Sequence, residues 1–433
     1  MKKGKRAKKG LRLISGVLAA FFMLDMLGGC AMKNKVVNYE IGKAPEHTLT
    51  FFGNKYETAN VEVIEDIIIG YLGENKDTII LYESLKGADY FEALRKREAS
   101  GHLDDIFIVD HDTALDFSAR ESLADLTELA KTVPFFDKIK SQMEAEDGRI
   151  YWVPTTVSAF GLYCNLDLLR EHGQQIPRTL GEWEAACDYF VEQGITPVIA
   201  NHDNSLKTLA LAQGFYPIYR DGKQNEVLER LSKGEEKLSS YLREGFLLAE
   251  EFCKKGYIDA KKTLKTQKTS DDLEEFIQGN APFMLTGAWA AGRVKGMEPD
   301  FAFQVVPYPV LEDGAVLVIN LDSRLGVSAK SENQEMAKEF VAYFLQEDNI
   351  RRFADNQSSF SPLKGIAYEP PLTEIQDIVS YYQTEVLVIG TDSRLRLPIW
   401  EKLGDVADGI LTGENVEDLL EWLDQQAAGE KTD

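Results

Sequence analysis

Short apolar runs alternate with longer amphipathic segments along the part of the chain that begins near residue 47. The runs at 48–53, 78–83 and 104–110 have the length and apolar content of buried strands. Between them, over 59–72 and 89–99, apolar side chains recur at helical spacing. A strand–helix–strand–helix–strand order favours a parallel sheet with right-handed crossover connections.

The same alternation continues in the second half of the chain with different residues. Thr179 to Glu182 matches a capping box, which starts a helix that we expect to end at Gly194. The segments 195–200 and 281–287 are predicted strands, and 271–279 is a predicted helix. The expected fold class is therefore α/β, with mostly parallel sheets flanked by helices.

The first thirty residues have a pattern that is typical of an export signal. Seven basic residues precede an apolar run at 13–24, which is shorter than the roughly 20 residues of a membrane-spanning helix. The run leads to LGGC at 27–30, which resembles the lipobox of bacterial lipoproteins, although Asp25 departs from that pattern. The alternatives are an uncleaved anchor and an ordinary signal peptide.

The lipobox resemblance implies a location for the mature protein. Residues 1–29 would be a lipoprotein signal peptide, Cys30 would carry the lipid, and 30–46 would be a tether. Stable anchoring takes two or more acyl chains, which this modification supplies. We therefore expect a lipid-anchored protein on the extracellular face of the cell membrane.

Composition and charge narrow the class of protein. Hydrophobic residues make up 44% and charged residues 27% of the sequence, as in a soluble globular protein. Its 433 residues are enough for two domains. The formal net charge is −23, and because 1–29 carry seven bases and one acid, the remainder is about −29. This balance argues against nucleic acid or an anionic membrane surface as a partner.

Common motifs of enzymes and metal sites are absent from the sequence. There is no GxSxG, Walker loop, GxGxxG or HExxH, and the five histidines are scattered without ligand spacing. Cys164, Cys187 and Cys253 show no CxxC spacing and are predicted to be buried apolar side chains. We expect no catalytic residue, no metal and no cofactor. A glycoside hydrolase is the enzymatic alternative, because two carboxylates suffice for it.

The carboxyl ends of the predicted strands supply the candidate binding site, since ligands of open parallel sheets bind beyond these ends. The residues there are Phe52, Asn54, Glu83, Ser84, Asp110, Asn201, Asp203 and Trp289. A sugar has hydroxyl groups that need polar partners and an apolar face that packs on an aromatic ring, so this set suits a carbohydrate. Asp110 could instead cap the next helix, and Glu83 could be solvated.

Further aromatic residues extend the candidate site. Trp289 follows Gly287, which we expect to allow a tight backbone turn that leaves the indole facing the cleft. The segment 215–222 is predicted to be an exposed loop that presents Tyr216 and Tyr219 to the ligand. Core packing and a local turn are the alternatives for that segment.

Nine segments occur in the order that is found in one known family. They are TFFGN (50–54), YES (82–84), LDDIFIVD (103–110), DGRIYWVPTTVSAFGLYCN (147–165), ITPVIANHD (195–203), FIQGNAPFMLTGAWA (276–290), PYP (307–309), RLGVSAKSENQEMAKEFVAYFL (324–345) and ILTGENVEDLLEWLDQ (410–425). From about residue 47 to the C-terminus, the chain resembles the family 1 extracellular solute-binding proteins of bacterial ABC importers, the family of maltose-binding protein. Gram-positive members are tethered by a lipobox.

The resemblance implies two α/β lobes joined by strands that cross between them. The crossings are expected at 151–165, 306–309 and 344–351. The N-terminal lobe would comprise 47–155 and about 308–350, and the C-terminal lobe about 156–307 and 351–433. Ligand binding would close the lobes by hinge motion.

The resemblance also implies a site and partners. Trp289 matches a position where a tryptophan commonly stacks on sugar, and 356–365 resembles a loop near the cleft, which adds Phe360. A monomer that delivers a monosaccharide or oligosaccharide to membrane permease subunits is expected. A polyamine or another polar solute is an alternative ligand, and a sensor kinase is an alternative partner.

Overall fold

The computed structural model describes residues 45–202, 204–266, 270–365, 372–384 and 386–429. The chain divides into two units, 1–44 and 45–433, and every described residue belongs to the second. The predicted signal peptide, Cys30 and most of the predicted tether lie outside the described residues, as does Asp203. Within the described ranges, no helix is both long and apolar enough to cross a membrane.

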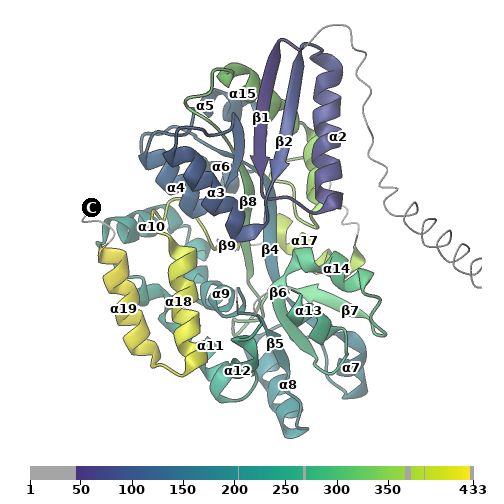
Figure 1. Cartoon of the computed structure of the whole chain (residues 1–433). Helices are drawn as coiled ribbons and strands as arrows, with labels where there is room; N and C mark the ends of the chain where they lie inside the picture. The colour runs from purple at the N-terminus through teal and green to yellow at the C-terminus, as the bar shows by residue number, and fades with distance from the viewer. Residues whose placement is uncertain (1–44, 203, 267–269, 366–371, 385, 430–433) are drawn as a thin grey trace, which may run out of the picture. The chain divides into compact units, whose positions relative to one another are not determined.

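The N-terminal half of the sheet has the predicted parallel order. β1 (His47–Gly53) pairs in parallel with β2 (Thr78–Ser84) and with β3 (Ile106–Val109). The crossover helices are α2 (Thr58–Glu74) and α3 (Gly87–Ala99), and each buries an apolar stripe. Figure 1 shows α2 beside β1 and β2. Each strand of this half therefore ends at the same edge of the sheet.

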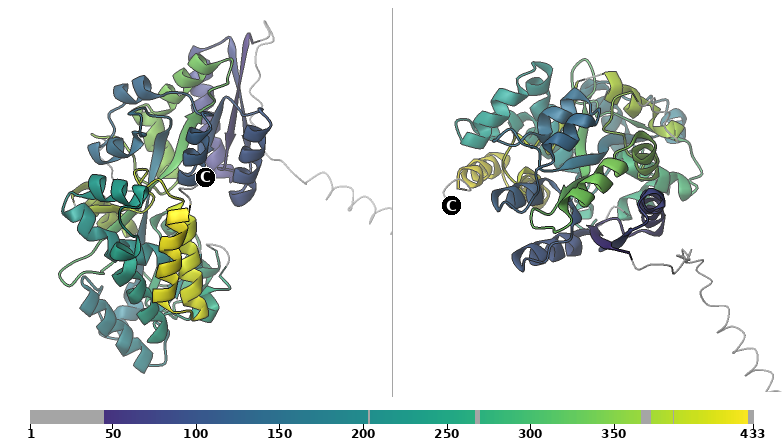
Figure 2. Two further views of the ribbon diagram at one scale, coloured as in Figure 1. Left: turned by 90° about the vertical axis from the view of Figure 1, so that its left-hand side faces the viewer. Right: turned by 90° about the horizontal axis from the view of Figure 1, so that it is seen from above.

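Two long antiparallel strands connect the halves of the sheet. All 13 residues of β4 (Val153–Asn165) are buried, and β4 pairs with β8 (Leu317–Val327). β8 pairs with β3 at its C-terminal end and with β9 (Leu387–Ile389) at its N-terminal end. In the described part of the chain, the strand order is β2-β1-β3-β8-β4-β6-β5. Figure 2 gives two further views of the helices around these central strands.

The second and third expected crossings differ from the structure. Instead of a crossing at 306–309, β7 (Phe303–Val306) pairs with the end of β4, and the strand that crosses is β8. The segment 344–351 comprises the last residue of α15 (Gln334–Phe344), a turn at Leu345 and Gln346, and the first residues of α16 (Glu347–Asn356). Apolar side chains of α15 recur every three or four residues, which favours a helix over a crossing strand.

Two predicted strands of the C-terminal half are confirmed but are shorter than expected. β5 (Val198–Ala200) pairs in parallel with β6 (Phe283–Gly287). Pro197 and Pro282 precede them, and a proline has no N–H for a strand ladder, so each strand begins after its proline. α8 (Leu180–Glu192) starts where predicted.

The segment 215–222 is not the exposed loop that we expected. Residues up to Arg220 belong to α9 (Ser205–Arg220), in which Phe215 and Tyr219 are buried. Pro217 lies in the last turns of this helix. A proline in the interior of a helix destabilises it by about 3 kcal/mol. Burial of an aromatic side chain stabilises the fold by about 1.5–3 kcal/mol, so burial of these two offsets the effect of the proline.

The remaining helices cover the two faces of the sheet and complete the core (Figure 1). They are α4 (His111–Ala119), α5 (Thr127–Thr132), α6 (Asp137–Met143), α7 (Leu166–Glu171), α10 (Gln224–Lys233), α11 (Ser239–Lys254), α12 (Ala260–Thr263), α13 (Asp271–Phe276), η1 (Ala288–Ala290), α14 (Ala291–Gly296), η2 (Thr373–Ile375), α17 (Gln376–Thr384), α18 (Ile399–Thr412) and α19 (Val416–Gly429). Cys164 and Cys187 are buried, as predicted, whereas Cys253 is only half-buried, and all three are free thiols.

Helix α16 contacts the N-terminal half of the molecule. Arg352 lies 3.4 Å from Asp66 of α2, and Gln357, which follows α16, donates to Asn60 Oδ1 at 2.7 Å. The expected C-terminal lobe included these residues from 351 onward. The lobe boundaries themselves stay a prediction.

Candidate functional site

A pocket of about 700 Å³ lies beside the crossing strands and is lined from both halves of the sheet. The N-terminal half contributes the segment after β1 and the start of α4. The crossing strands, η1, the segment after α16 and the start of α18 contribute the other walls. A pocket of this size that collects several polar groups is the usual form of a small-molecule site.

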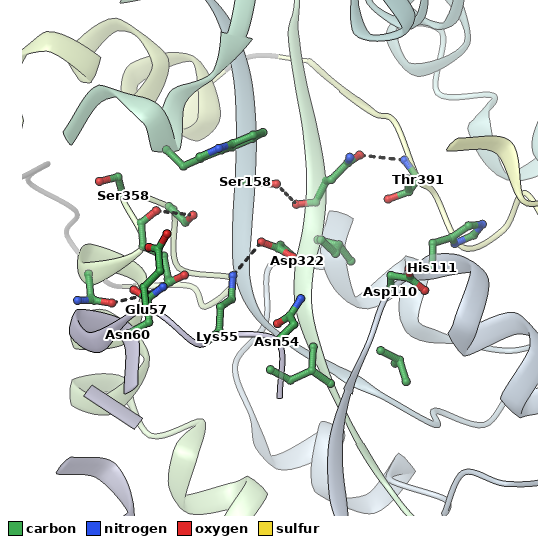
Figure 3. A pocket seen from close by; sticks show the side chains of 18 of the residues that line it. Asn54, Lys55, Glu57, Asn60, Asp110, His111, Ser158, Asp322, Ser358 and Thr391 are labelled. Atoms are coloured by element: carbon green, nitrogen blue, oxygen red, sulfur yellow. Dashed lines mark hydrogen bonds and ion pairs between the residues drawn. The ribbon is translucent and has the colours of Figure 1, made fainter. Parts of the chain in front are cut away.

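Two residues of the N-terminal wall follow strands, as predicted. Asn54 follows β1, and its Oδ1 is buried without a hydrogen-bond partner among the described residues. Asp110 follows β3 and accepts a 2.8 Å hydrogen bond from Thr113 N, so it caps α4 and also lines the pocket. Figure 3 shows both side chains at this wall.

The wall formed by β8 carries a polar network (Figure 3). Lys55 Nζ lies 3.5 Å from Asp322 Oδ2, which joins the segment after β1 to the crossing strand. Asn320 Oδ1 accepts from Thr391 N at 3.0 Å, and Ser158 Oγ lies 3.5 Å from Asn320 O. These contacts hold amide, ammonium and carboxylate groups at the pocket surface.

Three aromatic rings form one corner of the pocket. Phe160 of β4 is buried, with its ring centroid 5.1 Å from that of Trp289 and 5.7 Å from that of Trp400. Both indoles are half-buried, so each keeps some surface for a ligand. Lys207 Nζ lies 4.3 Å from the Trp400 ring centroid, which adds a cation–π contact that fixes this indole.

Gly287 has a different role from the one we expected. Its φ of −73° is a conformation that any residue adopts, so the tight turn does not require glycine. A Cβ at Gly287 would lie 2.0 Å from Cζ3 of Trp289, because the indole folds back over the glycine. The missing side chain therefore makes room for the Trp289 ring against Phe160.

Burial and neighbouring charges shift the pKa values of three ionisable groups beside the pocket. Burial, with the charges of Asp110 and Glu401, raises the pKa of Asp112 to about 7. Burial, with the charge of Arg324, lowers the pKa of His111 to about 3, so this imidazole is neutral. Arg324 is buried, which lowers its pKa to about 10. The pocket therefore contains a carboxyl group that changes charge near neutral pH.

Several predicted residues on β1 and β2 do not line the pocket. Phe52 is buried between α3 and the sheet, where the Arg97 guanidinium lies 3.7 Å from its ring centroid. Glu83 is largely exposed and pairs with Arg97 at 2.9 Å, which agrees with the solvated alternative. Ser84 ends β2 opposite Gly53 and is also absent from the lining.

The candidates in the C-terminal half are mostly core residues. Asn201 is buried and donates to Asp272 Oδ2 at 2.9 Å, and its neighbour Asp203 lies outside the described residues. Tyr219 is buried with its hydroxyl 2.9 Å from Asp392 Oδ2, and Tyr216 is half-buried in α9. Neither tyrosine lines the pocket.

Phe360 is close to the pocket but does not line it. It is buried and stacks on Tyr382, with ring centroids 4.9 Å apart. The residues just before it, from Asn356 to Ser359, do line the pocket, so the expected loop contributes through its polar residues.

Sequence reasoning missed several residues that line the pocket. They include Lys55, Asn60, Phe91, Asp112, Ser158, Phe160, Arg293, Asn320, Asp322 and Trp400. Trp400 begins a helix and Asp322 lies within a crossing strand, so neither follows a parallel strand. The described residues contain no group of three or more acidic, histidine or cysteine side chains that is suited to a metal ion.

The fold and the site define a class of protein: an α/β protein with a polar, aromatic-lined pocket between two halves that share crossing strands. A family profile described as bacterial extracellular solute-binding protein matches residues 72–377. The chain belongs to this family, as the sequence segments indicated. Its known members are binding proteins.

Relatives and solved structures agree with this assignment. The melibiose/raffinose/stachyose-binding protein MelE of Bacillus subtilis (strain 168) is 22% identical over 400 residues, covering 90% of each chain. The structure of the SBP RafE in complex with raffinose has a TM-score of 0.70 at 19% identity, covering 89% of this chain and 100% of that one. A sugar transporter from Bacillus licheniformis in complex with stachyose has a TM-score of 0.66 at 22% identity, covering 88% and 99%. These structures confirm the two-lobe fold.

Proposed function

We propose that this protein captures a neutral oligosaccharide in the main pocket and delivers it to an ABC importer in the membrane. The observation that carries the proposal is the corner of Trp289, Phe160 and Trp400 beside a polar wall. Aromatic faces pack on the apolar faces of sugar rings, and amides and carboxylates bond to their hydroxyls. The ligands of similar proteins support this ligand class. MelE is named as a melibiose/raffinose/stachyose-binding protein, RafE was solved with raffinose, and the Bacillus licheniformis protein was solved with stachyose.

Unpaired polar atoms in the pocket also favour a hydroxylated ligand. Asn54 Oδ1 and Asp112 Oδ1 are buried and have no hydrogen-bond partner among the described residues. Both are acceptors, and because they have almost no accessible surface in this structure, a sugar hydroxyl would donate to them only after the lobes close or the side chains rearrange. The pocket is lined by two cationic side chains, Lys55 and Arg293, and by four acidic ones, Glu57, Asp110, Asp112 and Asp322, so binding of spermidine is the control that separates a polyamine from a sugar.

The size of the pocket favours an oligosaccharide over a single sugar ring. Its volume of about 700 Å³ lies in the middle of the range for ligand pockets. Two indoles contact Phe160 and line the pocket, so they offer two stacking surfaces. We therefore expect Trp289 and Trp400 to contact different rings of one ligand.

The proposed function also includes a lipid anchor at Cys30 and docking on the permease subunits of the importer. The LGGC sequence at 27–30 supports lipid attachment at Cys30, which would hold a monomer on the extracellular face of the cell membrane. Closure of the two lobes around the ligand would form the surface that permease subunits recognise. No enzymatic step is part of this function.

Calorimetric titration with raffinose and stachyose tests the proposal, with spermidine as the cationic control. We expect saturable binding of at least one oligosaccharide and none of spermidine. Trp400→Ala should weaken binding about thirtyfold, because an aromatic anchor contributes about 2 kcal/mol. Saturable binding of spermidine alone would contradict the sugar proposal. Prolonged incubation with raffinose, monitored by chromatography, tests for an enzyme. Cleavage of the raffinose would support a glycoside hydrolase instead.

A further inference from the structure

The aromatic side chains that line the main pocket differ in how far they are exposed to solvent. Phe160 is 2% exposed, and Phe91, Trp289 and Trp400 are half-buried, whereas Tyr56 is 41% exposed. Because side chains at the opening of a pocket keep more contact with solvent than those at its floor, Tyr56 lies at the mouth. Among these rings it is therefore the most accessible to a part of the ligand that projects out of the pocket.

The loop that carries Tyr56 is held in place at the residue before it. The hydroxyl of Tyr82 on β2 donates to Lys55 O at 2.9 Å, which fixes the backbone. Lys55 Nζ lies 3.5 Å from Asp322 Oδ2 on β8, which fixes the side chain (Figure 3). A ligand that binds to a loop of fixed conformation loses no free energy to loop ordering, which otherwise weakens affinity. The Tyr56 ring is thus presented from a preorganised segment.

Gly53 allows the Tyr82 hydroxyl to reach this loop. A Cβ at Gly53 would lie 2.5 Å from the hydroxyl oxygen of Tyr82, which is closer than two side chains approach one another. The absence of a side chain at the end of β1 therefore makes room for the tyrosine that holds Lys55 O. The position of Tyr56 depends on residues of both strands.

The segment after β2 extends the accessible surface beside Tyr56. Leu85 N donates to Gly53 O at 3.1 Å, which places this segment next to the end of β1, and the Leu85 residue is 36% exposed. Lys86 Nζ lies 5.5 Å from the centroid of the Tyr56 ring, within the range of a cation–π contact. Glu57, the next residue along the chain, is exposed and lines the pocket. The mouth therefore combines an aromatic ring with an ammonium group and a carboxylate.

This combination of groups suits a sugar ring that lies outside the pocket. The apolar face of a sugar packs on an aromatic ring. Its hydroxyl groups can accept from the Lys86 ammonium group and donate to the Glu57 carboxylate. A tyrosine has only two side-chain torsions, so little conformational entropy is lost when its ring is covered. A charged group of either sign would meet a like charge at Lys86 or Glu57, whereas a neutral sugar ring meets none.

We propose that Tyr56 forms an outer subsite, at which a sugar ring stacks when the oligosaccharide is too long for the main pocket. The proposal rests on the capture of an oligosaccharide in the main pocket and adds a preference for longer chains. The inner rings of the ligand lie against Trp289 and Trp400, and a further ring lies against Tyr56. Affinity should therefore rise with the number of rings, and Tyr56 should contribute only to the binding of longer sugars.

Calorimetric titration of the full chain with melibiose, raffinose and stachyose tests the proposal, because each sugar of this series has one ring more than the sugar before it. The informative variant is Tyr56→Ala, and Tyr56→Phe keeps the ring while it removes the hydroxyl. The matched control is Leu81→Ala, since Leu81 on β2 is 52% exposed but does not line the main pocket. Urea melts check that each variant is folded, which the exposure of both side chains favours.

We expect the wild type to bind stachyose more tightly than the shortest sugar of the series that binds. Tyr56→Ala should weaken stachyose binding about tenfold, near the upper limit for one stacked aromatic ring, and leave the shortest sugar within about twofold. Tyr56→Phe and Leu81→Ala should keep the preference for stachyose.

The outer subsite, but not the proposed function, would be overturned by a wild type without a preference for stachyose. It would also be overturned if Tyr56→Ala bound stachyose within about twofold of the wild type, or lost as much affinity for a shorter sugar. If the wild type bound none of the sugars, the proposed function itself would be contradicted, and the outer subsite with it.

Discussion

The position of the Trp289 indole should depend on the absence of a side chain at Gly287. In Gly287→Ala the new Cβ would lie 2.0 Å from Cζ3 of Trp289, whereas ordinary contacts begin near 3.4 Å. The far edge of the indole must therefore move by more than about 1 Å, and misplacement on this scale strongly weakens the function of a positioned group. The backbone itself is not strained, since φ at Gly287 is −73°.

The expected effect on binding is larger than the effect on folding. Overpacking one methyl group typically costs about 1–3 kcal/mol of stability, and the half-buried indole has room to move toward the pocket. If Trp289 stacks on the ligand, Gly287→Ala should weaken raffinose binding by about tenfold or more, approaching the loss in Trp289→Ala. Titration calorimetry gives the affinity, and a urea melt gives the stability of each variant.

The control is Gly296→Ala, the same substitution at the end of α14, where a Cβ meets nothing within 4 Å. It should leave the affinity unchanged and leave the stability equal or slightly higher. A Gly287→Ala protein that binds raffinose within about twofold of wild type, with the indole displaced in its crystal structure, would refute the assignment of Trp289 to the site.

Three further predictions concern the anchor, closure and pH. Cys30→Ser should release the protein from membranes into the soluble fraction, and equal membrane retention of mutant and wild type would contradict lipid attachment. Saturating raffinose should reduce the radius of gyration in small-angle scattering without changing the circular dichroism, and an identical scattering curve would argue against hinge closure. Because the pKa of Asp112 is raised to about 7, its ionisation destabilises the fold as pH rises from about 4 to 7. The free energy of unfolding of Asp112→Asn, measured in urea melts and expressed relative to wild type, should therefore be about 1–2 kcal/mol higher at pH 8 than at pH 4. This is less than the full pKa shift would give, because Asp112 is only partly buried.

The position of a strand in the sheet explains which site predictions agree with the pocket. Asn54 and Asp110 follow β1 and β3, and Trp289 follows β6, strands that lie near the crossing strands in the sheet order. Glu83 lies at the C-terminal end of β2 and Asn201 follows β5, and these strands are the two ends of that order. The rule that ligands bind beyond strand ends does not distinguish inner strands from edge strands, and strand order was not evident from the sequence.

Other residues of the site could not be predicted from the sequence pattern around them. Asp322 lines the pocket because β8 crosses between the halves, and Trp400 because α18 begins beside Phe160. Both positions depend on contacts between residues that are far apart in the sequence. The order of strands and helices in the N-terminal half, by contrast, follows from local periodicity and was predicted correctly.

A crystal structure of the protein saturated with raffinose tests the central claim most directly. We predict a sugar ring packed on Trp289 or Trp400, with hydroxyl groups bonded to pocket residues from both halves, among them Asn54 or Asp110. Raffinose bound at another surface, or a main pocket that holds only water at saturating raffinose, would contradict the proposal that this pocket captures an oligosaccharide.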